Sequence, residues 1–424
     1  MASFKPKSGT ICYSDPNDLP SYVPPPKEFI EWRTNQLART KTATFNVTYV
    51  GFTPQAEAAF QEAVDIWSTL ITSPVEINIL AQWSALGQGV LGGATAGTYF
   101  RDFTGTQRHL IWHAVALAEK IARKELNDPG DPDIVASFSS GVDWHFDPNS
   151  APPSGKYDLV TVVLHEIGHG LGITKSYTVS GDNGLISEFF GLPVAYETLL
   201  ENSTGQNLVQ DFNSPSPDLK IQITGGALFS NSDIIRASNS GNKANVYAPP
   251  TFASGSSVAH LDETSYNSTA NALMTPFISP QEQNHNPGPI SMAILEEMGW
   301  KSLLIEHTPV PNTEDVLTPY VVVCKINTDE SYDPGSVTLR YKTETSPYTT
   351  VAMTATGNPD EFSATIPATG SAIEYAYYIT VKHGDDRIFK RPGGLYVQGV
   401  DSVAQLHIFL KRGQIPKHHY KSRT

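Results

Sequence analysis

The sequence predicts an α+β domain followed by a smaller all-β domain. Segments with strand-like alternation and segments with helical spacing follow one another over the first 300 of the 424 residues, as expected for helices packed on a twisted sheet. Beyond residue 316, short strand-like segments recur with Gly, Pro and Asn between them, as in a β-sandwich. Residues 306–315 have the Pro-rich, polar composition of a linker. Since 424 residues exceed what one core normally serves, two domains are expected.

We place the first domain at residues 44–304. It opens with an alternating strand at 44–50, followed by a helix at 54–71 whose first turn suits Pro54. The apolar spacing predicts further strands at 75–80, 133–138 and 142–146, and further helices at 112–123 and 289–298. Residues 1–43 are rich in Pro and polar residues, and we expect them to form an extended N-terminal segment, a candidate pro-segment.

The second domain is predicted at residues 316–412. Its strand-like segments lie at 320–325, 337–341, 362–366, 375–381 and 405–410. That spacing is typical of an accessory sandwich of the immunoglobulin or fibronectin kind. Residues 413–424 are expected to be a flexible basic tail.

The composition limits the class of protein. The formal net charge is −14, which disfavours binding to nucleic-acid phosphates. No apolar run reaches the length of a membrane span, and two cysteines do not make a disulfide scaffold. We expect a monomer. The first residues lack the apolar core of a secretory signal, so the protein is either cytoplasmic or has had such a signal removed or replaced.

The segment His165-Glu166-Ile-Gly-His169 carries the main chemical signal. On a helix, positions i and i+4 share a face, so both imidazoles can reach one metal ion, and Glu166 can act as general base on a water there. The preceding residues 159–164 are apolar except for Thr161, as in a buried helix. Glycines at 168, 170 and 172 would weaken a helix by about 1 kcal/mol each, so a requirement other than helix stability selects them.

A catalytic zinc normally has three protein ligands and an open fourth position. The residue six positions after His169, where a compact motif would place a third histidine, is Lys175. The third ligand must come from farther along, and His260 is the preferred candidate, with Met274 following in Ala272-Leu-Met-Thr-Pro276. The alternatives left open are His285, Glu188 and Glu197.

These parts together resemble the metzincin metallopeptidases, and within them leishmanolysin and similar bacterial secreted proteins. The resemblance covers roughly residues 44–300 and rests on His-Glu-x-x-His-x-x-Gly ending at Gly172, the late His260, and the turn Leu273-Met274-Thr275-Pro276. It implies a metzincin-type catalytic domain with one catalytic zinc ion held by His165, His169 and His260. It also implies that Met274 packs beneath the ligands without binding the metal, and that the protein is a secreted or cell-surface endopeptidase acting on proteins or peptides.

Several weaker expectations accompany this interpretation. Cys12 could cap the metal from a pro-segment, and Asp262 could orient His260 through a hydrogen bond. The clusters at 127–133 and 181–184 could bind calcium, although turns without metal also explain them. The competing function is a surface binding or adhesion protein with a degenerate metallopeptidase domain.

Overall fold

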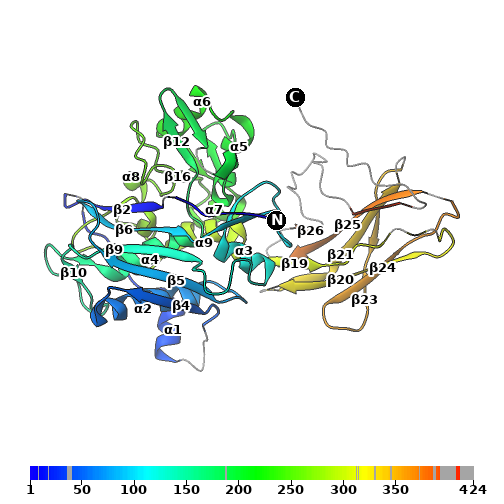
Figure 1. The fold of residues 1–424 in the computed structure, drawn as a ribbon, viewed down its shortest axis with the longest axis horizontal. Coiled ribbons are helices and arrows are strands. Elements are labelled where there is room, and N and C mark those ends of the chain that lie inside the picture. Colours follow the sequence, from blue (N-terminus) through cyan, green and yellow to red (C-terminus); the bar gives the residue numbers. More distant parts are fainter. Residues whose placement is uncertain are drawn as a thin grey trace. The chain divides into compact units, whose positions relative to one another are not determined.

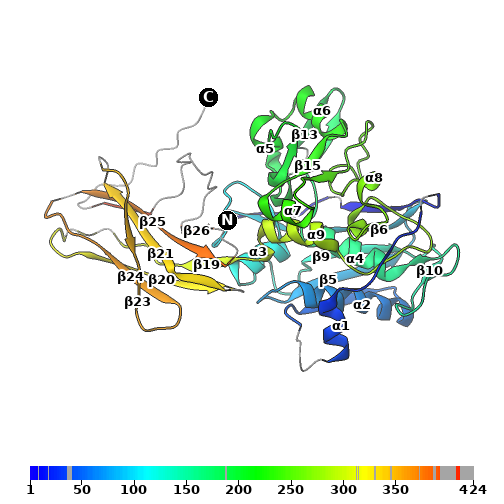
Figure 2. The same ribbon diagram turned by 180° about the vertical axis from the view of Figure 1, so that it is seen from behind.

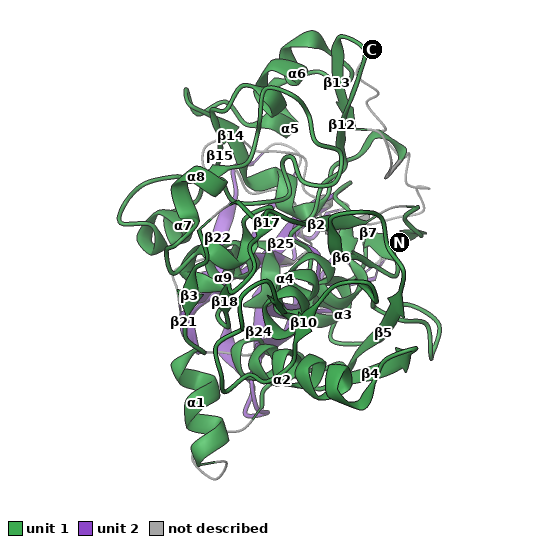
Figure 3. Cartoon of the chain, turned by 90° about the vertical axis from the view of Figure 1, so that its left-hand side faces the viewer, with its two compact units in different colours: residues 1–104, 110–301 green, residues 105–109, 302–424 purple. Residues whose placement is uncertain are grey.

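The chain divides into two compact units in the computed structural model: residues 1–104 with 110–301, and residues 105–109 with 302–424 (Figure 3). The predicted mixture of helices and strands is confirmed. No helix in the described part of the chain is both long and apolar enough to cross a membrane. The structure describes residues 1–7, 9–17, 19–35, 41–186, 189–311, 313, 315–328, 331–343, 346–371, 373–384, 388–391 and 407–410.

A six-stranded mixed sheet forms the centre of the first unit (Figures 1 and 2). Three of its strands are parallel and close to their predicted positions, and β6 runs antiparallel to β9. In spatial order the strands are β17 (Phe277–Ile278), β2 (Thr10–Ser14), β6 (Val90–Ala96), β9 (Ile134–Ser139), β5 (Ile77–Ser84) and β4 (Phe45–Val50). The predicted strand at 142–146 is shorter, β10 (Trp144–His145), paired with β11 (Tyr157–Asp158).

Two helices pack together against this sheet. Helix α2 (Pro54–Leu70) begins at the N-cap Thr53, whose side chain accepts a hydrogen bond from the Ala56 N–H. Helix α4 (Leu159–Gly170) is buried along its whole length and contacts α2, β2, β6 and β9. Its near-continuous apolar sequence therefore reflects burial on all sides. The other predicted helices appear as α3 (Val115–Ala122) and α9 (Gly288–Leu295), the latter followed by the π-helical segment η4 (Glu296–Trp300).

The described part of residues 1–43 differs from the predicted extended segment ahead of the domain, because it is packed into the first unit. Strand β1 (Ala2–Phe4) pairs with β7 (Tyr99–Arg101), β2 lies inside the central sheet, and β3 (Tyr22–Val23) pairs with β18 (Gln283–Asn284). Helix α1 (Lys27–Thr34) packs on α2. The expected extended conformation holds for β1, β2 and β3 but not for α1, and the composition does not reveal that strands elsewhere in the domain pair with this segment.

The remainder of the first unit consists of short elements between the sheet strands and after α4. They place the segments that carry His260 and Met274 beside α4. Those not yet introduced are β8 (His113–Ala114), β12 (Tyr177–Ser180), β13 (Asn183–Ile186), η1 (Phe189–Gly191), η2 (Ala195–Leu199), β14 (Leu200–Asn202), α5 (Leu208–Asp211), α6 (Pro217–Thr224), β15 (Leu228–Ser230), α7 (Asp233–Ser238), β16 (Ala244–Val246), α8 (Glu263–Tyr266) and η3 (Ala272–Met274).

The second unit has two antiparallel sheets and a hydrophobic core of its own. One sheet has the order β19 (Leu303–Glu306), β20 (Tyr320–Thr328), β24 (Glu361–Ile366), β23 (Thr354–Ala355). The other contains β22 (Thr349–Ala352), β21 (Tyr332–Thr343), β25 (Glu374–His383) and β26 (Ile388–Arg391), with β27 (His407–Leu410) also paired to β25.

The boundary between the units lies earlier than the predicted limit at residue 304. Strand β19 pairs with β20, and Leu303 and Ile305 are buried in the core of the second unit. The predicted linker is therefore mostly a loop between two strands of one unit. The predicted basic tail, 413–424, lies outside the described residues.

Candidate metal centre

Helix α4 presents His165 and His169 on one face, as their spacing predicts. Their Nε2 atoms are 3.0 Å apart, and neither residue has exposed surface. The helix begins at Asp158, whose carboxylate accepts hydrogen bonds from the backbone N–H and the hydroxyl of Thr161 at 2.8 and 2.7 Å. This N-cap starts the helix two turns before the first histidine and so determines which face points to the site.

His260 reaches the same point from a loop 91 residues beyond His169. Its Nε2 lies 3.1 Å from that of His169 and 3.2 Å from that of His165. The backbone on either side is held in place, because Tyr247 donates to the His260 carbonyl and Leu261 donates to the Met274 carbonyl, both at 2.9 Å. The structure thus brings together the three histidines that the sequence analysis selected.

The hydrogen bonds of the three rings define their tautomers. Each Nδ1 lies 2.6–2.7 Å from a backbone carbonyl oxygen: Leu273 for His165, Ile173 for His169 and Ser256 for His260. A carbonyl oxygen only accepts, so Nδ1 carries the hydrogen and each neutral ring has an unprotonated Nε2. Three such nitrogens cannot hydrogen-bond to one another. Three unprotonated nitrogens that face one another at 3.0–3.2 Å form a group that could hold a metal ion.

The spacing of the nitrogens suits zinc. Imidazole nitrogens bound tetrahedrally at 2.0–2.1 Å from zinc are about 3.3 Å apart, close to the observed separations. Burial also keeps the rings neutral, which metal binding requires. It lowers the pKa of His165 to about 4, and it lowers the pKa values of His169 and His260 as well, with a further contribution from neighbouring histidines.

Glu166 lies beside His165 and is itself fully buried. Neither carboxylate oxygen has a hydrogen-bond partner of normal geometry. Burial raises the pKa of this carboxyl, while the nearby backbone N–H groups of Cys12 and Ala94 lower it. A Cβ on Gly92 would lie 3.2 Å from Glu166 Cγ and Oε1, so glycine there leaves room for the carboxylate. A buried carboxyl with unused oxygens is suited to accept a proton from a water or substrate in the site.

Met274 packs against the helix that carries two of the histidines. Its side chain is 1% exposed, and a Cβ built on Gly168 would be 2.9 Å from its sulfur. The preceding carbonyl, that of Leu273, is the partner of His165 Nδ1. This explains the glycine at 168, because any side chain there would collide with Met274. Gly172 has φ +122°, which explains the third glycine of the motif.

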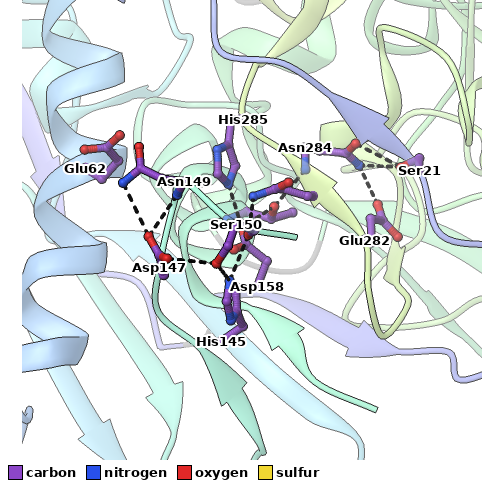
Figure 4. A network of polar contacts seen from close by, with 12 residues as sticks. Ser21, Glu62, His145, Asp147, Asn149, Ser150, Asp158, Glu282, Asn284 and His285 are labelled. Atoms are coloured by element: carbon purple, nitrogen blue, oxygen red, sulfur yellow. Dashed lines mark hydrogen bonds and ion pairs between the residues drawn. The ribbon is translucent and has the colours of Figure 1, made fainter. Parts of the chain in front are cut away.

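The alternative third ligands lie elsewhere or outside the described residues. His285 Nε2 is 2.7 Å from the Asp158 carboxylate at the start of α4 (Figure 4). Glu197 accepts hydrogen bonds from the backbone N–H groups of Ser176, Tyr177 and Val194, and it forms no group with the histidines. Glu188 is outside the described residues. Asp262 is the N-cap of α8, where it accepts from Ser265, so it does not orient His260, whose Nδ1 bonds Ser256.

The two segments proposed for calcium, 127–133 and 181–184, do not form a cluster of ligand side chains like that of the three histidines. Asn127 donates to Asp133, whose other oxygen accepts from the Asn78 N–H. Among the described residues, groups of three or more His, Cys, Asp or Glu side chains that could hold a metal are the three histidines and a second set of Cys12, His165 and Glu166. Calcium binding at 127–133 or 181–184 stays a prediction.

Two supporting features escaped the sequence analysis. The first is the Asp158 cap, which the pattern of an acidic residue three positions before Thr161 at the start of an apolar run could have indicated. The second is the pairing of His285 with that cap across 127 residues, for which the sequence contains no local signal.

No protein-family model matches the sequence, and a search of curated proteins also finds no match. The case for a function therefore rests on the residues of the site.

Proposed function

We propose that this protein is a zinc-dependent endopeptidase of the metzincin type, similar to leishmanolysin. The observation that supports it most strongly is the convergence of three buried, unprotonated Nε2 atoms beside an unpartnered carboxylate. His165, His169 and His260 would hold one zinc ion. When bound, zinc would polarise the peptide carbonyl and make a water more acidic.

The chain's own groups would move the proton. Glu166 would accept the proton of the attacking water and pass it to the departing amine nitrogen. Burial raises the pKa of Glu166, which favours the protonated carboxyl that the return step needs. Met274 would support the ligands by packing under Gly168, without contacting the metal.

The remaining predictions belong to the same proposal. The first unit would be a metzincin-type catalytic domain and Met274 its turn. The second unit would be an accessory sandwich of the immunoglobulin or fibronectin kind, since two antiparallel sheets contribute to one core. Secretion or display at the cell surface follows from the resemblance alone.

The test combines metal analysis with a casein-cleavage assay, with and without a chelator. We expect one zinc per chain in the parent and in Glu166→Gln, and less in His169→Ala and His260→Ala. Glu166→Gln should lower the cleavage rate by about 10²–10⁴-fold, the usual contribution of a general base. His109→Gln serves as a control, because it removes an exposed histidine that lies outside the site.

Zinc retained in the parent, with equal cleavage by Glu166→Gln, would refute the role of Glu166. Absence of both zinc and cleavage would instead favour the competing function, a binding or adhesion protein with a degenerate site.

A further inference from the structure

The rings of His169 and His260 are oriented by carbonyl groups on two segments that lie far apart in the sequence. His169 Nδ1 donates to the Ile173 carbonyl at 2.6 Å, and His260 Nδ1 donates to the Ser256 carbonyl at 2.7 Å. The first carbonyl lies just after α4, and the second lies in the loop that carries His260. The two rings can therefore bind one ion only if these two segments keep a fixed position relative to each other.

The segment around Ser256 is a compact turn. The Ala253 carbonyl accepts hydrogen bonds from the N–H groups of Ser256 and Ser257 at 3.0 and 2.8 Å, and the Ala253 N–H donates to the Ser257 hydroxyl at 2.9 Å. These bonds fix the internal shape of residues 253–257 but not the position of this turn in the first unit. The place of the Ser256 carbonyl depends on the contacts that the turn makes with other segments.

The backbone between this turn and the third ligand is strained. Val258 has φ +74°, a left-handed conformation that a β-branched residue rarely adopts, and it is fully buried. Its N–H donates to the Tyr247 carbonyl at 2.8 Å. Because a strained conformation persists only where the surrounding contacts impose it, the loop before His260 needs support on both sides of Val258.

Lys175 provides support on the side of the turn. Its ammonium donates to the Ser254 carbonyl at 2.7 Å and lies 5.1 Å from the centre of the Phe252 ring. Lys175 also follows closely on Ile173, the residue whose carbonyl orients His169. The Lys175 side chain thus connects the segment that orients one ligand to the turn that orients another.

We infer that Lys175 is a positioning residue of the metal centre, which holds the turn that orients His260 against the segment that orients His169. The inference rests on the proposed function, of which it uses only the metal ion. Lys175 occupies the position six residues after His169 at which a compact motif would place the third histidine. In this chain the residue at that position orients the distant histidine and does not itself bind the ion.

The test compares variants of the full chain, and the main variant is Lys175→Met, which keeps the apolar stem and removes the ammonium. The Ile11 N–H donates to the Gly255 carbonyl at 3.1 Å and still ties the turn to β2, so the turn should loosen without unfolding. Loss of an outer-shell partner of a metal ligand typically lowers metal affinity by about 10–100-fold. Since Lys175 acts through the turn and not on the ring itself, we expect zinc to dissociate into a chelator about tenfold faster.

Lys220→Met is the matched control. The Lys220 ammonium also donates to a backbone carbonyl, that of Gly181, at 2.8 Å, but neither segment orients any of the three rings. This variant should retain zinc as the parent does. Lys175→Arg keeps a cation that can donate to the Ser254 carbonyl, and it should restore slow dissociation.

The visible spectrum of the cobalt-substituted protein separates the orientation of the ligands from general stability, because the absorption of Co²⁺ depends on the geometry of its ligands. We expect Lys175→Met to shift the absorption bands, and Lys175→Arg and Lys220→Met to keep those of the parent. Urea unfolding of the metal-free proteins should show similar losses of stability for Lys175→Met and Lys220→Met.

Equal zinc dissociation from the parent and Lys175→Met would overturn the inference, and so would equal acceleration by Lys220→Met or a failure of Lys175→Arg to restore retention. Faster dissociation with an unchanged cobalt spectrum would also overturn it, since Lys175 would then support the fold without orienting the ring. If Lys175→Met does not fold, Phe252→Leu replaces it; this variant removes the ring beside the ammonium and should also release zinc faster, and parental retention would count against the inference. A parent that binds neither zinc nor cobalt would overturn the proposed function itself.

Discussion

The contact between Gly168 and Met274 allows a quantitative test of the support beneath the metal centre. In an ordinary helix, Gly168→Ala would stabilise by about 1 kcal/mol. Here the new methyl would lie 2.9 Å from the Met274 sulfur and 3.3 Å from its Cε. Overpacking of this kind costs about 1–3 kcal/mol, so the net effect should range from neutral to a destabilisation of about 2 kcal/mol.

The partner substitution removes the obstacle. Met274→Ala deletes a side chain that is 1% exposed and should cost about 2–5 kcal/mol through the cavity it leaves. In the double variant the methyl at 168 has room and fills part of that cavity. The double variant should therefore be more stable than the sum of the two single effects predicts, by about 1–3 kcal/mol.

The assay is urea unfolding of the four proteins with zinc present, together with zinc content. Because His165 Nδ1 bonds the carbonyl next to Met274, Gly168→Ala should also weaken zinc retention against a chelator. Strictly additive effects on the free energy of unfolding would mean that Met274 does not support α4 as described.

Two further predictions concern buried acids of the first unit. Asp158→Ala should lower the free energy of unfolding by about 2–4 kcal/mol, because it removes the cap of α4 and leaves buried His285 without its carboxylate. Asp262→Ala, which removes the cap of α8, should lower it by only about 1 kcal/mol. Equal losses in urea unfolding would contradict this reasoning. Burial and nearby Asp133 raise the pKa of Glu119 to about 8, so the folded state binds its proton more tightly than the unfolded state, and this contribution to stability is lost as the pH rises towards 8. Glu119→Gln should flatten the fall in stability between about pH 6 and 8, and identical slopes in parent and variant would refute the assignment.

The sequence was most informative where chemistry and local geometry coincide. Helix α4 and the pairing of His165 with His169 follow from the four-residue spacing, which any helix converts into one face. His260 lies in a loop 91 residues beyond His169, and no local spacing identifies it as a ligand. It could be selected only through the family motif that pairs a late histidine with Met274.

Long-range strand pairing explains what could not be predicted. The alternation in residues 10–14 is compatible with a strand, but nothing local identifies β6 and β17 as its neighbours, and β17 lies more than 260 residues away. The same holds for Leu303–Glu306, whose apolar residues suit either unit until β20 is known as the partner. Strand pairing is made by backbone hydrogen bonds, so the side-chain pattern of a strand says little about which strand it pairs with.

The carbonyl partners of the three imidazoles have a consequence for engineering. Since Leu273, Ile173 and Ser256 contribute main-chain oxygens, no exchange of one side chain for another deletes the groups that aim the rings. The path of the backbone in three separate segments therefore sets the orientation of the rings. Transferring the three histidines alone to a different helical scaffold would not transfer the carbonyl groups that orient their rings. A graft that includes these backbone segments would transfer both the rings and the groups that orient them.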